Sequence, residues 1–413
     1  MSTQHQEAVT RSINRQLSLN SSSVAEAFLR WLVGELECGE LVIETPPRNR
    51  IVFAGRRPGP RAKVTIHSWR CLWRLVSSRD IGFAEAYSAG EWSSSNLVAL
   101  LKLASRNSAL AEPLKFLRAS RFWLRILHAM NRNTRRGSRR NIAAHYDLGN
   151  EFYQHWLDPS MTYSAGLFSS MNQTLEQAQD AKLDLVLGLL DLTGGEKVLE
   201  IGCGWGSLAE RMMERHECTV TGVTLSAEQL AFTQRRLSGR AFYERSDIRL
   251  QDYRDVRGTF DRIVSIEMLE AVGEAYWPTY FQNLRNRLRP GGIGVLQVIT
   301  IDEDRFGDYR RRPDFIQKYI FPGGMLPTTK AIERETSKVG LKLVTKEFFG
   351  DSYARTLEEW RRRFLKSWPA IEALGFDERF KRTWEYYLAY CQAGFETGAI
   401  SVGLYKVARP QSM

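Results

Sequence analysis

From about residue 177 the chain alternates between amphipathic segments with helical spacing and short apolar segments typical of buried strands. Helices are predicted at 177–191, 206–214, 226–237 and 275–288. Strands are predicted at 197–202, 218–225, 247–252, 260–266 and 292–300. This alternation predicts an α/β fold of Rossmann-like type, in which helices cover a largely parallel sheet.

Two more strand-like segments follow at the C-terminal end, "GLKLVTKEFFG" and "GAISVGLYKVAR", separated by a helical insertion at about 355–395. A final hairpin pair on a parallel sheet is the usual ending of the fold of S-adenosylmethionine (SAM) methyltransferases. The pattern therefore predicts a seven-stranded mixed sheet rather than the sheet of a nicotinamide dehydrogenase.

The N-terminal third has a different pattern. A helix is predicted at 24–34, short strands at "LVIETP" and "RIVFAG", and helices at 94–107 and 112–130. We expect a smaller N-terminal basic domain at 1–135 and a methyltransferase domain at 136–413.

Charge separates the same two parts. Of the net charge of +11, residues 1–140 hold 23 Lys and Arg against 10 Asp and Glu, and the remainder holds 35 against 37. No acidic residue interrupts 115–140, where Arg118, Arg121 and Arg125 share one helical face and the apolar residues of "RFWLRILHAM" mostly take another. A solvated basic helix and a surface for anionic lipid headgroups both fit this run. A nucleic-acid surface fits the charge, but no nucleic-acid-binding motif accompanies it.

The other compositional features narrow the class of protein. The polar start predicts no secretory signal, and no apolar run approaches the roughly 20 residues that span a bilayer. Five scattered cysteines without a C-x-x-C pair predict neither a disulfide framework nor a metal site. We therefore expect a cytoplasmic protein without a bound metal.

A glycine-rich turn follows the first strand of the predicted sheet, in "VLEIGCGWGSLAE". Gly202, Gly204 and Gly206 form G-x-G-x-G, whereas dinucleotide folds prefer G-x-G-x-x-G, which aims a helix at a pyrophosphate. SAM has no phosphate and needs a close backbone approach, which glycine permits. Glu200 before the turn favours SAM, as does the end of the next strand, "GVTLSAEQ", where Thr224, Ser226 and Gln229 replace the common carboxylate.

Several ordered motifs resemble the cyclopropane fatty acid synthases and their mycolic acid relatives: "HYDLGNEFYQHWLDPSMTYSAGLF", "VLEIGCGWGSLAE", "GVTLSAEQ", "LQDYRD", "FDRIVSIEMLEAVG", "KYIFPGG" and "WRRRFLKSWP". The resemblance runs from about residue 80 to the C-terminus. It implies a SAM-dependent C-methyltransferase that acts on the double bond of unsaturated acyl chains in membrane phospholipids.

The resemblance also implies where SAM binds. Its methionine end would lie on the three glycines, its ribose would be held after the second strand, and its adenine would lie after the third. The residues implied are Tyr146, Tyr163, Ser164, Gly202, Gly204, Gly206, Thr224, Leu225, Gln229, Asp252 and Tyr253.

In the family, bicarbonate serves as the base that removes a proton, and a Glu, a Tyr, a His, a Cys and backbone groups hold it. Glu270 and Tyr353 stand at the Glu and Tyr positions of this cradle. Ala165 replaces the Cys and Gln297 replaces the His. The usual His after the Glu is Ala271, and Glu267 stands where a small residue is common.

Three readings of the altered cradle stay open. In the first, bicarbonate binds with Gln297 as a donor and a cyclopropane forms. In the second, Glu270 or Glu267 is itself the base, with a pKa raised by burial beside the other carboxylate. In the third, a proton is lost elsewhere and a methyl-branched chain results. A nucleic-acid methyltransferase and a non-catalytic lipid- or SAM-binding relative are the alternatives from other classes. The resemblance favours lipid for the basic third and implies an anionic membrane surface at the inner face of the cell membrane as a partner, with no nucleic acid and with a homodimer left open.

Overall fold

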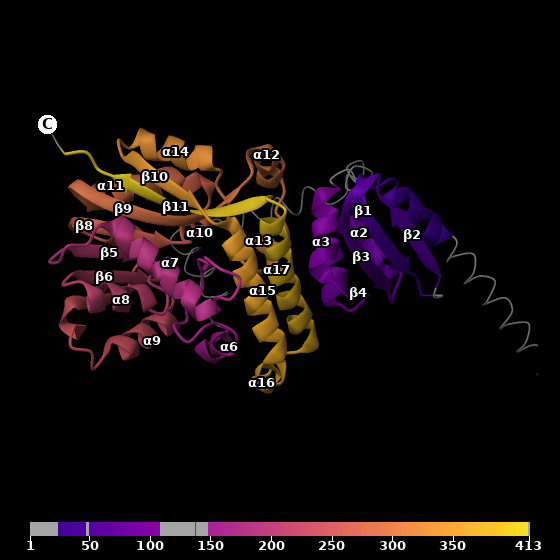
Figure 1. Ribbon diagram of the computed structural model, residues 1–413, viewed down its shortest axis with the longest axis horizontal. Coiled ribbons are helices and arrows are strands. Elements are labelled where there is room, and N and C mark those ends of the chain that lie inside the picture. Colours follow the sequence, from indigo (N-terminus) through magenta and orange to yellow (C-terminus); the bar gives the residue numbers. More distant parts are fainter. Residues whose placement is uncertain (1–23, 47–48, 108–136, 138–147, 412–413) are drawn as a thin grey trace, which may run out of the picture. The chain divides into compact units, whose positions relative to one another are not determined.

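The computed structural model describes residues 24–46, 49–107, 137 and 148–411 (Figure 1). By its internal contacts the chain divides into two compact units. The first comprises the described part of 1–120 with Glu378–Tyr386, and the second comprises the described part of 121–377 with Tyr387–Met413. The predicted boundary at 135/136 and the predicted helix at 112–130 lie outside the described residues, so both stay predictions.

The N-terminal unit contains a helix over 24–33 and a four-stranded sheet in the order β2-β1-β3-β4. The strands are β1 (Cys38–Glu44), β2 (Arg50–Ala54), β3 (Arg57–Ile66) and β4 (Trp92–Ser94), and the helices are α2 (Arg70–Ser88) and α3 (Leu97–Arg106). The sequence pattern predicted β1, β2 and α3. It predicted no element for 56–93, where β3, α2 and most of β4 lie. In β3, Pro58, Gly59 and Pro60 lie where the pairing of β1 with β3 shifts register between Cys38 and Glu40.

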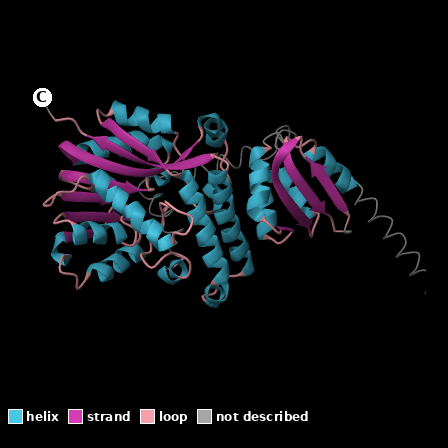
Figure 2. Cartoon of the chain, viewed as in Figure 1, coloured by secondary structure: helices cyan, strands magenta, loops and turns pink. Residues whose placement is uncertain are grey.

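The second unit is built on a seven-stranded sheet in the order β10-β11-β9-β8-β5-β6-β7 (Figure 2). The strands are β5 (Lys197–Ile201), β6 (Thr219–Thr224), β7 (Ser246–Leu250), β8 (Phe260–Ile266), β9 (Leu288–Ile301), β10 (Lys342–Phe348) and β11 (Ile400–Ala408). β5 to β9 pair in parallel, and β11 is antiparallel to both β9 and β10. The predicted seven-stranded mixed sheet is confirmed.

Helices follow the strands in the predicted order. They are α6 (Asn150–Gln154), α7 (Leu175–Leu190), α8 (Ser207–Arg215), α9 (Ala227–Leu237), α10 (Leu269–Val272), α11 (Trp277–Arg287), α12 (Glu303–Arg311), α13 (Phe315–Tyr319), α14 (Thr329–Lys338), α15 (Gly350–Lys366), α16 (Trp368–Ala373) and α17 (Glu378–Glu396). The last three lie between β10 and β11 and contain the stretch predicted as a helical insertion. Helix α7 begins with a capping box between Thr174 and Gln177.

The core of this unit lies between the sheet and its helices, where Leu199, Ile263 and Leu296 of three neighbouring strands are fully buried with Leu284 of α11. Because β5 and β6 lie on one side of the point where the strand order reverses and β8 and β9 lie on the other, the loops at their carboxyl ends meet there. Within the described residues, no helix is long and apolar enough to cross a membrane.

Candidate active site

The glycine turn joins β5 to α8 with a left-handed backbone at all three glycines, φ +80° at Gly202, +53° at Gly204 and +83° at Gly206. A Cβ on Gly202 would lie 2.4 Å from Met268 Sδ, and one on Gly206 would lie 2.4 Å from Thr233 Cγ2. A Cβ on Gly204 would meet nothing within 4 Å. Gly202 and Gly206 are therefore required by packing, whereas Gly204 leaves the backbone open to a ligand.

The end of β6 supplies the polar residues predicted to hold a ribose. Thr224 Oγ1 donates to Gln229 Oε1 at 2.8 Å, and both side chains are buried. Ser226 caps α9 by accepting from the Gln229 backbone N–H at 3.3 Å. Leu225, between them, is half-buried.

After β7, the Asp252 carboxylate pairs with Arg254 at 2.6 Å, and Asp252 is only 2% exposed. The Arg254 guanidinium also lies 5.6 Å from the ring centre of Tyr253. Burial raises the pKa of the Tyr253 hydroxyl, so this side chain stays neutral. The loop therefore presents a buried carboxylate and an aromatic face together, as expected of an adenine-flanking segment.

The segment that precedes α7 carries two of the predicted residues. The Tyr163 and Tyr387 hydroxyls share a hydrogen bond of 2.7 Å. Ser164 Oγ accepts from Lys182 Nζ at 2.8 Å. Tyr146 lies outside the described residues, so its predicted role stays a prediction.

Glu267 follows β8 in a left-handed conformation with φ +52°, which costs a residue with a side chain roughly 1–2 kcal/mol. Its Oε1 accepts from Gln297 Nε2 at 2.7 Å and from the Ala165 backbone N–H at 3.0 Å. Its Oε2 accepts from the Tyr353 hydroxyl at 2.7 Å. Burial raises the pKa of Glu267, and the three donors and the charge of Lys182 counteract part of this rise.

These three donors stand at the positions that the family resemblance assigns to the Cys, His and Tyr of a bicarbonate cradle. Here they all bind a carboxylate of the chain itself. Gln297 does act as a donor, as one reading of the sequence expected, but its partner is Glu267.

Glu270 completes the group. Its Oε1 accepts from the Ile299 backbone N–H, and burial together with the charge of Glu267 raises its pKa to about 8. Among the described residues, neither Glu270 Oε2 nor the buried Gln297 Oε1 has a hydrogen-bond partner.

The remaining polar atoms of this group do not fit bicarbonate. The donors of Ala165, Gln297 and Tyr353 bind Glu267, and the Ile299 N–H binds Glu270. Of the described side-chain atoms of this group, those without a partner are Gln297 Oε1, which is an acceptor, and Glu270 Oε2, which belongs to a carboxyl group that is neutral below about pH 8. Both lie beside the Glu267 carboxylate, whose negative charge disfavours a second anion.

Aromatic rings pack around Tyr353, whose hydroxyl donates to the Glu267 carboxylate. The Tyr353 ring lies 4.6 Å from Phe395 and 6.0 Å from Trp360, measured between ring centres. Trp360 in turn lies 5.2 Å from Tyr163. Aromatic faces are negative and attract positive charge, so these walls suit a reaction that passes through a cation.

Two buried polar residues of α7 that approach this site, Gln179 and Lys182, were not predicted from the sequence. Each is 1% exposed, on the face that also buries Leu175, Leu183 and Val186. A signal was present, because both positions follow the helical spacing of the apolar face and yet hold polar residues. A buried lysine there indicates a specific role for its charge.

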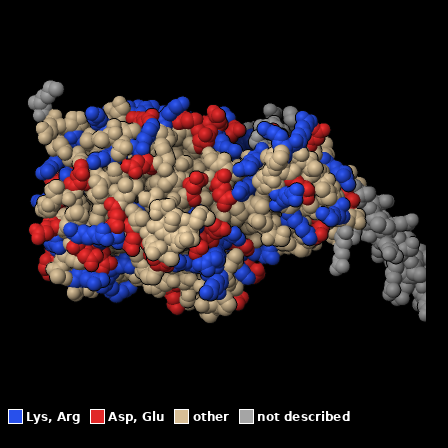
Figure 3. Space-filling model, viewed as in Figure 1, with Lys and Arg blue, Asp and Glu red and all other residues tan. Residues whose placement is uncertain are grey.

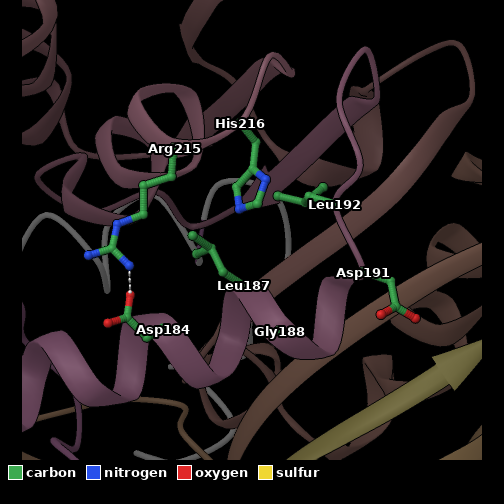
Figure 4. Close-up of a pocket in the computed structure, with 7 residues that line it drawn as sticks. All are labelled: Asp184, Leu187, Gly188, Asp191, Leu192, Arg215 and His216. Atoms are coloured by element: carbon green, nitrogen blue, oxygen red, sulfur yellow. Dashed lines mark hydrogen bonds and ion pairs between the residues drawn. The ribbon is translucent and has the colours of Figure 1, made fainter.

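A separate pocket of about 320 Å³ lies elsewhere (Figure 4). Its lining residues are Asp184, Leu187, Gly188, Asp191, Leu192, Arg215 and His216. They belong to the ends of α7 and α8 and to the segments that lead into β5 and β6, at the amino edge of the sheet. Asp184 and Arg215 pair there at 2.5 Å, and no predicted site residue takes part.

The strand order, the antiparallel β11 and the open glycine turn define the class of SAM-dependent methyltransferases. Within that class, the family model described as mycolic acid cyclopropane synthetase matches residues 133–404, so the chain belongs to this family. SAM fits the residues present, since Gly204 leaves its backbone open and Thr224, Gln229 and Asp252 offer buried polar groups at neighbouring strand ends.

Individual relatives agree with this placement. The chain is 40% identical over 365 residues to tuberculostearic acid methyltransferase UfaA1 of Mycobacterium tuberculosis. The matched region covers 85% of this chain and 84% of that one. It is 42% identical over 258 residues to cyclopropane-fatty-acyl-phospholipid synthase of Escherichia coli, which covers 62% of this chain and 65% of the relative. A solved structure of mycolic acid cyclopropane synthase CmaA1, complexed with SAH and CTAB, is 30% identical, with a TM-score of 0.62 over 65% of this chain and 98% of that one.

Replacement of Gly204 by alanine tests the cofactor contact. We expect Gly204→Ala to weaken binding of S-adenosylhomocysteine at least about tenfold, or about 1.4 kcal/mol, because a methyl group would enter the open space above the turn. Calorimetric titration measures this. Gly239→Ala is the matched control, since Gly239 also has positive φ (+79°) and open space around its Cβ. Equal effects of the two changes would contradict the assignment.

The raised pKa of Glu270 predicts a pH-dependent stability. Between the ordinary value of 4.5 and about 8, the folded protein holds a proton that the unfolded chain releases, so the contribution of neutral Glu270 is present at low pH and is lost as the pH rises. We expect Glu270→Gln, which mimics the neutral form, to remove on the order of 2 kcal/mol of this decline.

Unfolding midpoints in urea at a series of pH values measure this effect. Glu358→Gln is the control, because Glu358 is exposed. Parallel curves of stability against pH for wild type and Glu270→Gln would show that folding does not raise the pKa of Glu270.

Proposed function

We propose that this enzyme transfers a methyl group from SAM to the double bond of an unsaturated phospholipid acyl chain, and that Glu267 takes the proton that is lost. The observation that supports this most is the set of three donors around the Glu267 carboxylate, at the positions where family members hold bicarbonate. The relatives named as fatty acyl or fatty acid enzymes support the substrate class.

The proposed reaction requires a base, and it requires that water be kept from the cation that forms on the acyl chain. Bound SAM supplies an electrophilic methyl group. The π-electrons of the acyl chain form the new carbon–carbon bond, and the neighbouring chain carbon becomes positively charged. Glu267 and the faces of Tyr353 and Trp360 stabilise this charge, and their burial keeps water from the cation.

Proton loss then decides the product. We infer that Glu267 accepts a proton from a chain carbon next to the cation, so that the C–H electron pair becomes a new double bond and a methyl-branched alkene results. Three hydrogen bonds fix this carboxylate in one place. A base that is fixed in one place removes the proton that faces it. The relative UfaA1, matched over 85% of this chain, is named a methyltransferase.

A cyclopropane is the second candidate product, since the relative from Escherichia coli is named a cyclopropane synthase. In that case the new methyl group would lose its proton to Glu267. Glu267 would be the proton acceptor for either product.

We further propose that the basic N-terminal third binds the anionic inner face of the cell membrane. Trp31 and Trp73 are large exposed aromatics of this unit, with 56% and 73% of their surface exposed, and tryptophan favours lipid interfaces. On the face shown in Figure 3, Lys and Arg are interspersed with Asp and Glu over the second unit. Arg118, Arg121 and Arg125, the predicted basic face, lie outside the described residues.

Glu267→Gln tests the assignment of the base. The amide keeps an oxygen for the donors but cannot accept the proton, so we expect turnover with unsaturated phospholipid vesicles to fall by about 10²–10⁴-fold. Binding of S-adenosylhomocysteine should persist. Formation of S-adenosylhomocysteine from SAM measures turnover, and Glu347→Gln at an exposed position is the control.

Wild-type turnover in Glu267→Gln would contradict the proposal. Mass analysis of the fatty acids from the wild-type reaction distinguishes the two products. A gain of one CH₂ that is accompanied by one reducible double bond indicates the methyl-branched alkene, and a gain that resists hydrogenation indicates the ring.

Charge reversal tests the membrane proposal. We expect simultaneous replacement of Arg118, Arg121 and Arg125 by glutamate to weaken sedimentation with anionic vesicles strongly, since each basic residue near such a surface contributes about 1 kcal/mol. Neutral vesicles should show no such difference. Unchanged sedimentation with anionic vesicles would refute the predicted surface.

A further inference from the structure

We propose that Gln179 and Lys182 of α7 are positioning residues for Glu267: Gln179 fixes the peptide group that donates to the Glu267 carboxylate, and Lys182 supplies the buried positive charge that keeps this carboxylate ionised. This inference rests on the proposed role of Glu267 as the base.

One peptide group links α7 to the carboxylate. Its carbonyl oxygen, on Ser164, accepts from Gln179 Nε2 at 2.7 Å. Its N–H, on Ala165, donates to Glu267 Oε1 at 3.0 Å. Because the peptide group is planar, a hydrogen bond that fixes the carbonyl also fixes the direction of the N–H.

Lys182 holds the same residue by its side chain, donating to Ser164 Oγ at 2.8 Å. Helix α15 holds the chain just beyond, where Thr356 Oγ1 accepts from Gly166 N–H at 3.1 Å and Ser352 Oγ accepts from Phe168 N–H at 3.1 Å. The donor of Ala165 is therefore fixed from two helices.

The charge of Lys182 is buried without a directly bonded counter-charge. Lys182 is 1% exposed, and among the described residues no carboxylate lies within ion-pair distance of its Nζ. Burial lowers the pKa of Lys182 to about 8, while the charges of Glu267, Asp158 and Glu200 raise it again. A buried ammonium costs stability, and an apolar side chain could fill this place more cheaply. The positive charge of Lys182 favours the ionised form of the nearby carboxylates, which an apolar side chain cannot do.

Other titratable groups act on Glu267 from the elements around it. Glu270 of α10 repels its charge, and the Tyr353 hydroxyl of α15 donates to it. Burial raises the pKa of the Cys391 thiol of α17, and the charges of Asp314 and Glu267 raise it further. Of the neighbours named, Lys182 is the one cation, so its removal should raise the pKa of Glu267.

Lys182→Met tests the role of the charge and Gln179→Leu tests the role of the peptide group, both in the pH profile of kcat measured with unsaturated phospholipid vesicles. Activity requires ionised Glu267, so kcat should rise with pH through the pKa of this group. We expect Lys182→Met to move this acidic limb upward by on the order of one pH unit. Lys182→Arg, which keeps the charge, should leave the limb in place. Gln179→Leu should lower kcat at every pH, by about tenfold, and should move the limb less than Lys182→Met does, because it loosens one of three donors and removes no charge.

Lys197→Met is the control, since Lys197 is exposed at the start of β5. Binding of S-adenosylhomocysteine verifies that each variant is folded. If Lys182→Met is folded and the acidic limb of its pH profile of kcat stays in place, the inference is overturned. It is also overturned if both Lys182→Met and the smaller change Lys182→Gln lose S-adenosylhomocysteine binding. If Glu267→Gln keeps wild-type turnover, the proposed function itself fails; if it loses turnover while the limb stays, only the inference about Lys182 fails.

Discussion

The hydrogen bonds that converge on the Glu267 carboxylate are the interaction on which the proposed chemistry of this protein depends. They join three distant parts of the chain: the segment before α7, the strand β9 and the helix α15. Each donor loses its water when the site is built, and an unpaired donor there would cost about 1–3 kcal/mol. The chain meets this requirement with its own carboxylate, on a residue held at positive φ. Strained backbone of this kind is common where a side chain must be aimed at a reaction.

A second constraint is the balance of charge. Glu267 and Glu270 are close enough for one to raise the pKa of the other, so the pair resists carrying two negative charges. Glu270 can stay neutral while Glu267 is ionised, and buried Lys182 favours this division. In the proposed reaction, this single carboxylate would face a cation that forms on an apolar chain. In such surroundings a single negative charge is more effective than in water, because little solvent screens it.

The sequence predicted the strands of the sheet and their succession along the chain, because strands such as β5 and β8 are short apolar runs between amphipathic helices and the glycine turn follows the first of them. It predicted neither β3, which contains two prolines and a glycine, nor the role of Lys182, whose charge stands on an otherwise apolar face. Glu267, Glu270, Gln297 and Tyr353 were each singled out from the family motifs. That Glu267 binds the donors of the other positions could not be predicted, since it depends on side-chain directions among residues up to 188 positions apart in the chain, from Ala165 to Tyr353.

The most direct test of this account is the dependence of turnover on bicarbonate. The donors that would bind the free anion are already bound to Glu267. Purified wild-type enzyme should therefore convert unsaturated phospholipid at the same rate in buffer stripped of carbon dioxide and in buffer with added bicarbonate. A rate that falls when bicarbonate is removed, and returns when it is restored, would contradict the central claim that Glu267 serves as the base.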